Sequence, residues 1–287
     1  MSISVILVTY SRDRFLSSTI ESILSQTLTD FELLISDDCS PDGTEAVCRT
    51  FASRDKRVRY RRNDTRLGMP GNLNAAVREA RGDLIANLDD GDLYDPRLLE
   101  RWHDALVECP NAAFVFNAYR HLDADGSERA ITRERLPRCF PGRVLLEGRY
   151  FRVWRFDSPV WGTVMARRSA YEAVGLFDER FGFYADVDMW MRLAEGFSVA
   201  YVDEPLITLP SRETVPRLFS LAKGEEGRTL RQMFWEARMR HYQDRPVRRV
   251  LEAGRHGAFA VSASAVERGL HVRRKLLAPG TRNRHDS

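Results

Sequence analysis

The sequence of 287 residues predicts an α/β fold with a mostly parallel central sheet flanked by helices, followed by a mainly helical C-terminal extension. Over the first hundred residues, β-branched apolar runs alternate with segments of helical spacing, which is typical of right-handed βαβ units. After about Pro216 the sequence shows helical spacing with many arginines and no strand pattern. We therefore expect an α/β domain at 1–212 and a basic helical extension at 213–287.

Apolar patterns predict the elements of the first half in order. Ser4–Thr9 is a β-branched run that ends at polar residues, which predicts a buried strand. The following helix has apolar residues at 15, 16, 20, 23 and 24, the spacing of one helix face. The same criteria predict strands at 31–36, 58–61 and 84–88, and helices at 44–51, 72–80 and 96–107.

The second half is less regular. Ala112–Tyr119 predicts a strand, and Asp123–Gly126 predicts the turn of a hairpin. Further segments predict strands at 160–166 and 198–202 and a helix at 186–194.

Composition indicates an ordinary soluble protein. No apolar run approaches the roughly 18 residues that a membrane span needs, and the start lacks the features of a signal peptide. The four cysteines show no metal-type spacing, so we expect reduced thiols and a cytoplasmic protein. They are Cys39, Cys48, Cys109 and Cys139.

The charge is unevenly distributed. The net charge is +3, but the segment 215–287 has 16 Lys and Arg against 7 Asp and Glu, a balance of +9 that leaves −6 for the rest. A basic tail on an acidic body is typical of contact with an anionic surface, such as phosphate-bearing lipid or nucleic acid. We expect peripheral contact with an anionic membrane and no nucleic-acid partner. A merely solvated helical face is an equally good interpretation, and the sequence leaves the oligomeric state open.

Polar groups follow three of the predicted strands. They are 8–12 after the first strand, Asp37-Asp38 after the second, and 89–92 (Asp-Asp-Gly-Asp) after the fourth. Each group alone could be a turn or a helix cap. Since ligands of open parallel sheets bind beyond the carboxyl ends of the strands, three such groups at one edge predict a binding site.

The residue types indicate the chemistry of that site. Carboxylates one residue apart can ligate Mg²⁺ or Mn²⁺, and such a cation neutralises a leaving diphosphate. A carboxylate after the second strand can accept a hydrogen bond from a nucleobase or a ribose, and Tyr10 offers a stacking face. No Gly-rich loop follows the first strand, which argues against a dinucleotide or P-loop site.

Six segments, in order, resemble family 2 glycosyltransferases, and the resemblance covers residues 1 to about 210. The segments are Ile3–Arg12, Asp37–Ser40, Leu67–Asn74, Ala80–Asp92, Gly175–Glu179 and Asp186–Leu193. The resemblance implies a GT-A fold, a UDP- or TDP-type sugar donor, Mn²⁺ or Mg²⁺, and inverting transfer to an acceptor hydroxyl. It also implies nucleotide contacts by Val8, Thr9, Tyr10, Arg12, Asp37, Asp38, Asn72, Asp89 and Asp90.

The metal motif departs from the commonest family pattern, Asp-x-Asp-Asp, because Gly91 stands where an Asp is usual. A variant ending in Asp-Gly-Asp fits better, so Asp90 and Asp92 are the first choice of metal ligands. Asp89 then lies beside the metal rather than on it.

The resemblance assigns the general base to Asp186. Many members have Glu before this Asp, whereas this chain has Ala185. The alternative is that Asp186 or Asp188 caps the helix that follows. On the acceptor side we expect Trp161, Asp188 and Trp190, since an aromatic ring packs well on a sugar, although both tryptophans could equally be core residues.

Two other functions remain possible from the sequence. A sugar nucleotidyltransferase should have a Gly-rich basic loop after the first strand, and 9–12 (Thr-Tyr-Ser-Arg) does not supply one. A non-catalytic sugar-nucleotide sensor would not need Asp90, Asp92 and Asp186. The acceptor, whether a glycan, a lipid-linked sugar or a small molecule, is left open, and synthesis of a bacterial glycan is the expected setting.

Overall fold

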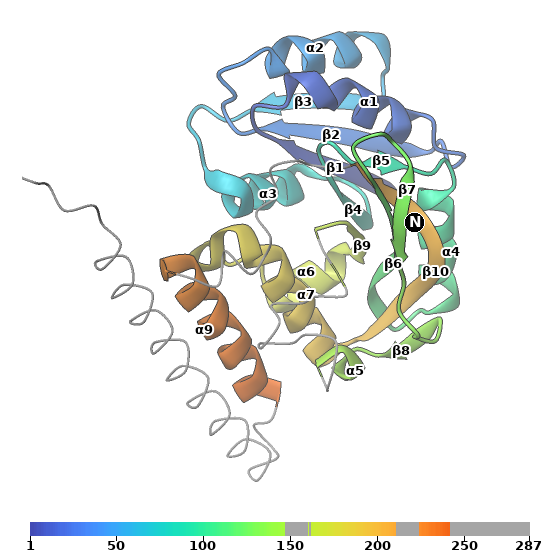
Figure 1. Ribbon diagram of the computed structural model, residues 1–287, viewed down its shortest axis with the longest axis vertical. Helices are drawn as coiled ribbons and strands as arrows, with labels where there is room; N and C mark the ends of the chain where they lie inside the picture. The colour runs from blue at the N-terminus through green and yellow to red at the C-terminus, as the bar shows by residue number, and fades with distance from the viewer. Residues whose placement is uncertain (147–159, 161, 211–223, 242–287) are drawn as a thin grey trace, which may run out of the picture.

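The computed structural model describes residues 1–146, 160, 162–210 and 224–241 (Figure 1). The strands of this part form one mixed sheet in the order β3-β2-β1-β4-β9-β6-β10-β5, with β7 paired to β6 and β8 paired to β10. Helices cover both faces of the sheet (Figure 1). The predicted α/β fold class is therefore confirmed.

The first half of the sheet is parallel, as predicted. Its strands are β1 (Ile3–Thr9), β2 (Phe31–Asp37), β3 (Val58–Arg62) and β4 (Leu84–Asp89). Thr9 lies opposite Asp37, and Val8 lies opposite Asp89, so the carboxyl ends of β1, β2 and β4 meet at one edge. The connecting helices are α1 (Asp13–Leu24), α2 (Thr44–Arg54), α3 (Gly68–Glu79) and α4 (Leu98–Glu108).

The second half adds strands of both directions. β9 (Val164–Arg167) runs antiparallel between β4 and β6 (Ala112–Leu122), and β10 (Ser198–Leu209) runs parallel to β6. The short strands are β5 (Leu93–Tyr94), β7 (Glu128–Thr132) and β8 (Cys139–Pro141). The helices are α5 (Arg143–Leu146), α6 (Arg168–Val174), the 3₁₀ helix η1 (Glu179–Tyr184) and α7 (Ala185–Gly196).

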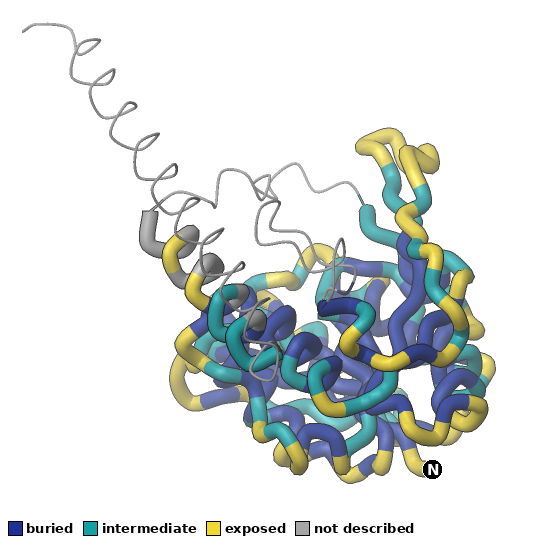
Figure 2. Tube along the Cα trace, turned by 90° about the horizontal axis from the view of Figure 1, so that it is seen from below, coloured by how far each residue is buried: buried dark blue, intermediate teal, exposed yellow. Residues whose placement is uncertain are grey.

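The two faces of the sheet carry two separate apolar cores. Successive side chains of a strand point to opposite faces, so Ile6 of β1 packs with α3, α6 and α7, whereas Val5 and Leu7 pack with α1 and α4. Figure 2 shows that buried segments run through the interior of the described part. The sheet is thereby held between two layers, and its carboxyl edge is left for the polar residues.

The described helix of the C-terminal extension, α9 (Gly224–His241), packs against α7 and η1. Met233 and Ala237 are buried in the core that α7 contributes to. Arg240 of this helix pairs with Glu195 of α7 at 3.1 Å. The predicted boundary at 212–213 lies outside the described residues, as do the later arginines. No helix in the described part combines the length and the apolar character that crossing a bilayer requires.

Cys109 and Cys139 form a disulfide, so the expectation of reduced thiols is wrong for this pair, whereas Cys39 and Cys48 are free. The antiparallel pairing of β8 with β10 sets Cys139 opposite Ala200 and beside the end of α4. A separation of 30 residues in the sequence gave no sign of this contact.

Candidate active site

The chain turns sharply after β1 and β2. Ser11 and Cys39 take left-handed backbone conformations, with φ of 54° and 62°, although neither is glycine. The Ser11 N–H donates to the Ser40 hydroxyl at 3.0 Å, and the Asp38 N–H donates to the Thr9 carbonyl at 3.0 Å. Such conformations persist where surrounding contacts hold them, and they concentrate at functional sites.

The two carboxylates after β2 are buried and saturated by internal donors. Asp37 accepts hydrogen bonds from the N–H and the hydroxyl of Ser40 and from the Tyr60 hydroxyl. Asp38 accepts from the N–H groups of Leu67 and Gly68, at 2.7 and 2.9 Å, and from the Asn63 amide. In this structure Asp38 therefore holds the loop before α3, and Asp37 holds the turn after β2 and Tyr60 of β3.

Asn72 belongs to the same buried layer. Its amide donates to the Ser36 carbonyl at 2.8 Å, and its oxygen accepts from the Ser36 hydroxyl at 2.6 Å and from the Asn63 amide at 3.0 Å. Three of the residues expected to contact the nucleotide are thus buried and hydrogen-bonded within the protein. They are Asp37, Asp38 and Asn72.

Tyr10 and Val8 are both half-buried at this end of the sheet, while Thr9 between them is buried. The guanidinium of Arg66, which sequence reasoning did not single out, lies 4.0 Å from the centre of the Tyr10 ring. An aromatic ring and a cation at the ends of parallel strands are suited to a planar nucleobase.

The turn after β4 wraps around the Thr19 hydroxyl. That hydroxyl donates to the Asp92 carbonyl at 2.9 Å and accepts from the Gly91 N–H at 3.0 Å. Gly91 has a φ of 86°, a conformation that favours glycine, which explains why no Asp stands there. The turn leaves the Asp90 side chain 14% exposed and 3.3 Å from the Arg12 Nε, whereas Asp92 is buried.

The donor set at this turn fits a hard divalent cation. It consists of carboxylate oxygens, the ligands that Mg²⁺ and Mn²⁺ prefer. Among the described residues, no group of three or more His, Cys, Asp and Glu is arranged to hold a metal ion. Mg²⁺ is commonly held by only one or two carboxylates together with substrate phosphates, so a donor diphosphate would have to complete the coordination.

Asp186 of α7 lies near enough to Asp89, at the end of β4, to be affected by its charge. Asp186, in the first turn of α7, is only 8% exposed and accepts a hydrogen bond from the Val187 N–H at 2.7 Å. Burial, and then the nearby charge of Asp89, raise the pKa of Asp186 to about 7.

Gly162 lies directly against the Asp89 carboxylate. A Cβ atom at position 162 would lie 2.7 Å from Oδ2 of Asp89, closer than real contacts allow. Glycine therefore permits the chain before β9 to pass directly over the Asp89 carboxylate, and the sequence gave no sign of this contact.

Two residues expected on the acceptor side are packed into the interior instead. Asp188 is buried and accepts a hydrogen bond from Arg192 at 2.7 Å. Trp190 is fully buried, with ring centres 5.7 Å from Phe114 and 5.9 Å from Phe177, so it offers no face to a sugar. Trp161 lies outside the described residues.

The capping alternative for these aspartates also fails. The N-cap of α7 is Tyr184, and both Asp186 and Asp188 lie within the first turn of the helix.

Asn74, which sequence reasoning passed over, binds the Phe177 N–H and carbonyl at 2.8 and 3.0 Å and connects α3 to the segment before η1. Both ends of this contact lie in segments already noted for the resemblance, which is the signal that could have found it.

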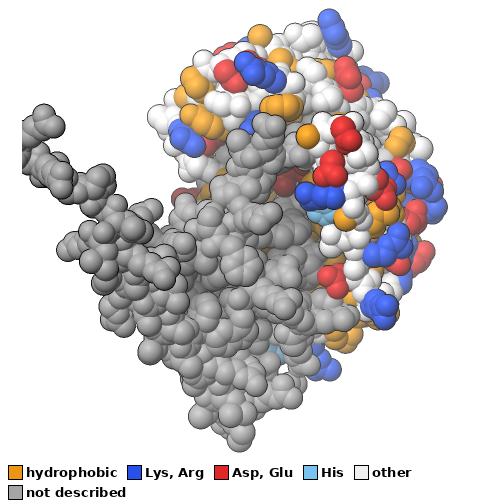
Figure 3. Space-filling view, viewed as in Figure 1, with side chains coloured by type: hydrophobic (Ala, Val, Ile, Leu, Met, Phe, Trp, Pro, Cys, Tyr) orange, Lys and Arg blue, Asp and Glu red, His pale blue; other side chains and the backbone are white. Residues whose placement is uncertain are grey.

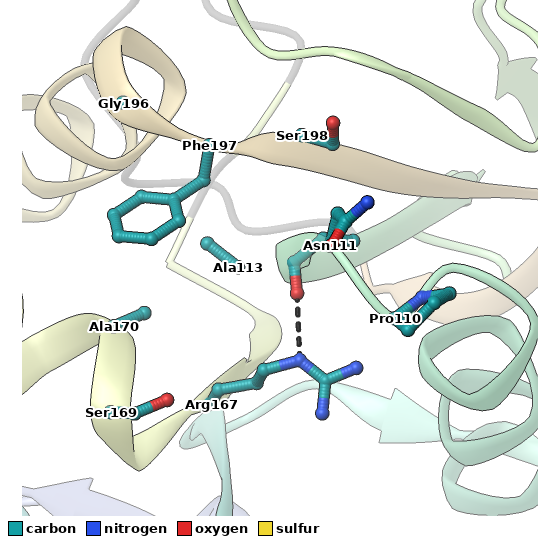
Figure 4. Close-up of a pocket in the computed structure, with 10 residues that line it drawn as sticks. Pro110, Asn111, Ala113, Arg167, Ser169, Ala170, Gly196, Phe197 and Ser198 are labelled. Carbon is teal, nitrogen blue, oxygen red and sulfur yellow. Dashed lines mark hydrogen bonds between the residues drawn. The ribbon is translucent and has the colours of Figure 1, made fainter.

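A separate cavity of about 410 Å³ lies at the amino ends of β6 and β10, away from these carboxylates (Figure 4). Arg167 at its rim donates to the Ala112 carbonyl at 2.9 Å. The lining contains no carboxylate. It therefore has none of the chemistry that the carboxyl edge of the sheet assembles.

Residues 4–175 match the family model described as glycosyl transferase family 2. The chain belongs to this family. The protein named EpsE of Bacillus subtilis (strain 168), a glycosyltransferase by its name, is 32% identical over 208 residues, which is 71% of each chain. The protein is thus a nucleotide-sugar-dependent glycosyltransferase.

A second relative and a solved structure extend the comparison. The Escherichia coli enzyme WfgD, named UDP-Glc:α-D-GlcNAc-diphosphoundecaprenol β-1,3-glucosyltransferase, is 32% identical over 42% of this chain and 47% of its own length. The mannosyltransferase PcManGT of Pyrobaculum calidifontis, solved with GDP-Man and Mn²⁺, has a TM-score of 0.59 and 17% identity, covering 96% of this chain and 81% of its own. At that identity the likeness concerns the fold alone, and it agrees with a GT-A architecture.

Proposed function

We propose that this glycosyltransferase moves a sugar from a UDP- or TDP-type donor to an acceptor hydroxyl by a single displacement that inverts the anomeric carbon. The observation that carries the proposal is the pairing of two unlike carboxylates at one edge. Asp90, whose side chain is 14% exposed, pairs with Arg12, and Asp186 is buried near the charge of Asp89. The first suits a phosphate-bound cation, and the second suits proton abstraction.

The donor nucleoside would lie against the end of β1. Tyr10 and Arg66 supply its planar contacts, and Val8 and Thr9 supply the strand end beneath it. Asp38 would act mainly by holding Leu67 and Gly68 in place, because its oxygens already accept their N–H groups. Asp37 and Asn72 would act indirectly, since Asp37 accepts from Tyr60 of β3 and Asn72 donates to the Ser36 carbonyl of β2.

The donor diphosphate would lie over the turn after β4. Asp90 would be the principal carboxylate for Mn²⁺ or Mg²⁺, with Asp92 reaching it only if its buried side chain turns outward. When bound, such a cation neutralises the charge that develops on the leaving diphosphate. Arg12 would approach the same phosphates from the end of β1, since its side chain is 46% exposed next to Asp90.

Asp186 would accept the proton of the acceptor hydroxyl. A pKa near 7 suits a general base, because such a group is ionised near neutrality and still binds a proton well. Asp89 favours the protonated form of Asp186 by its own negative charge. A single displacement requires no covalent carboxylate on the opposite side of the sugar, and it inverts the reacting carbon.

The acceptor is proposed to be a lipid-linked sugar of a bacterial glycan, reached at the cytoplasmic face of the membrane. Support comes from WfgD, whose name specifies an acceptor on diphosphoundecaprenol. The basic balance of +9 over 215–287 agrees with a negatively charged surface nearby.

Thermal unfolding with UDP, TDP and GDP, each with and without Mn²⁺, tests the donor and metal parts of the proposal. A ligand present at a hundred times its dissociation constant stabilises the fold by about 2.7 kcal/mol. We expect a Mn²⁺-dependent shift with UDP or TDP that Asp90→Ala removes and Asp92→Ala weakens.

The control is Asp104→Ala, which removes an exposed carboxylate of α4 far from the strand ends. Its shift should equal that of the unmodified protein. An undiminished Mn²⁺ effect in both Asp90→Ala and Asp92→Ala would contradict the metal assignment and favour Asp89. Equal shifts without Mn²⁺ would contradict the need for a metal.

A further inference from the structure

The exposed apolar side chains are unevenly placed on the molecule. Among the described residues, the large apolar side chains that are exposed are Met1, Phe15, Leu67, Val107 and Phe183. Phe15, Leu67 and Phe183 are 57%, 47% and 67% exposed, and all three lie at the edge where the candidate site forms. Single exposed apolar residues need no explanation, but several at one edge of the molecule indicate an interaction surface.

Each of the three borders a different part of the site. Phe15 is in the first turn of α1, three residues after Arg12, which contacts Asp90. Leu67 immediately precedes α3, and its N–H is held by Asp38.

Phe183 lies in η1, three residues before Asp186. The backbone of η1 breaks at Gly182, with φ of 51° and ψ of −124°, immediately before this exposed ring. A Cβ atom at Gly71 of α3 would lie 2.9 Å from the Leu67 Cβ and 3.9 Å from Glu179 of η1, so Leu67 and η1 are neighbours.

Exposed arginines accompany these apolar residues. Arg14 precedes Phe15, Arg66 precedes Leu67, and Arg180 lies in the same 3₁₀ helix as Phe183. Among the described residues neither Arg14 nor Arg66 takes part in an ion pair, whereas Arg180 pairs with Asp178. Figure 3 shows apolar and charged side chains interspersed over the described surface rather than gathered in one large patch.

Apolar side chains mixed with arginines are suited to the boundary of an anionic bilayer. There the apolar groups enter the acyl region while the guanidinium groups stay among phosphates. A lipid-linked acceptor would present its sugar at that boundary, within reach of Asp186. The extension with its balance of +9 adds to the attraction.

We propose that Phe15, Leu67 and Phe183 form an apolar rim that places the active-site edge on an anionic membrane, so that Asp186 and Asp90 face a membrane-held acceptor. The proposal extends the proposed function, since it rests on a lipid-linked acceptor. It differs from contact through the basic extension alone, because the three residues of the rim border the candidate site and thereby set its orientation.

Val107 provides a matched control. It is 54% exposed, but it lies near the end of α4, where the chain approaches the amino end of β6 and hence the opposite edge of the sheet. The test compares the full-length protein with F15S/L67S/F183S and with V107S. Each is sedimented with vesicles of phosphatidylglycerol and phosphatidylethanolamine in 0.1 M and 1 M NaCl.

At 1 M salt the screening length is only about 3 Å, so charge attraction through the extension fades and apolar contact remains. At each of the two salt concentrations we expect V107S to bind vesicles as strongly as the unmodified protein does. The triple variant should bind at least about tenfold more weakly at 1 M salt. Equal binding by the triple variant would overturn the proposal, and so would absence of binding by the unmodified protein, which would favour a protein partner or a soluble acceptor.

Hydrogen exchange of the unmodified protein provides a measurement that needs no variant. Vesicles should slow exchange at 13–16, 66–69 and 180–184 and leave 104–108 unchanged. No protection at the first three segments in vesicle-bound protein would overturn the proposal.

Hydrolysis of a UDP-sugar with Mn²⁺ in the absence of vesicles separates this proposal from the proposed function. F15S/F183S, which leaves Leu67 of the loop held by Asp38 unchanged, should retain that activity, because these two side chains lie outside the reacting groups. Loss of hydrolysis by a folded F15S/F183S variant would place these residues in the active site instead. Vesicle binding without any nucleotide binding would leave the rim standing and refute the proposed function.

Discussion

The end of β2 and the junction of β4 with α7 both carry buried aspartates, but their surroundings differ. Asp37 and Asp38 are surrounded by N–H, hydroxyl and amide donors. Asp186 accepts a hydrogen bond from the adjacent Val187 N–H and faces the negative charge of Asp89. The donors thus fix Asp37 and Asp38 in the fold, whereas burial, and then the charge of Asp89, raise the pKa of Asp186 and favour the binding of a proton there.

The largest effect is expected from substitution of Asp186, the aspartate whose pKa is raised. Asp186→Asn keeps the size of the side chain but removes its basicity, and loss of a general base typically lowers the rate by ~10²–10⁴. Transfer or donor hydrolysis should fall by that factor, while the Mn²⁺-dependent thermal shift with nucleotide should persist. A variant with unchanged turnover would contradict the assignment of the base.

The matched control is Asp188→Asn, two residues along the same helix. Asp188 holds Arg192, which also donates to the carbonyls of Val174 and Leu176. We expect this variant to lower stability and to reduce the rate far less than Asp186→Asn. A comparable loss of rate in the folded Asp188 variant would contradict the contrast between the two residues.

The second effect is expected from substitution of Asp38, one of the aspartates at the end of β2 that are held by donors. Asp38→Ala removes the acceptor of the Leu67 and Gly68 N–H groups and of the Asn63 amide. Since an unsatisfied buried donor costs about 1–3 kcal/mol, we expect the free energy of unfolding to fall by roughly 2–4 kcal/mol. Denaturant unfolding measures this loss. A variant as stable as the unmodified protein would show that these donors find water or other partners.

The pH dependence sharpens the same contrast. Because the pKa of Asp186 is raised to about 7, the ionised base is lost as pH falls below that value. Donor hydrolysis between pH 5.5 and 8.5 should decrease by about tenfold per pH unit on the acid side. A flat profile across pH 7 would contradict a base with this pKa.

Stability should follow the opposite trend. The folded state binds this proton more tightly than the unfolded state, in which the pKa is near 4. The contribution of Asp186 to the free energy of unfolding is therefore fully present below the unfolded-state pKa, and it is lost as pH rises through the folded-state pKa of about 7. Asp186→Asn cannot titrate, so the difference in stability between the variant and the unmodified protein should grow in favour of the variant over this range.

The smallest effect concerns Gly162. A Cβ atom there would press on Oδ2 of Asp89, so Gly162→Ala should displace this carboxylate and lower the rate by about tenfold. Its matched control is Gly196→Ala, where an added Cβ meets nothing within 4 Å. Equal rates for the two variants would show that the chain at 162 moves aside without disturbing the site.

The sequence by itself determined the parallel half of the fold and the place of the site. The strands at 4–9, 31–36 and 84–88 were predictable because β-branched runs ended at turn-forming residues, and parallel strands bring such ends to one edge. The order and spacing of the motifs were sufficient to identify the family. These are local signals, and local signals are visible in a single chain.

Only the tertiary structure decided which carboxylates are saturated and which face each other. The donors to Asp38 come from 25 to 30 residues further along the chain, and Asp89 at the end of β4 acts by its charge on Asp186 of α7. Trp190 and the disulfide partners likewise depended on packing that no spacing reveals. Burial and charge proximity arise from contacts distant in sequence, and for this reason the role of each aspartate could not be derived from its motif alone.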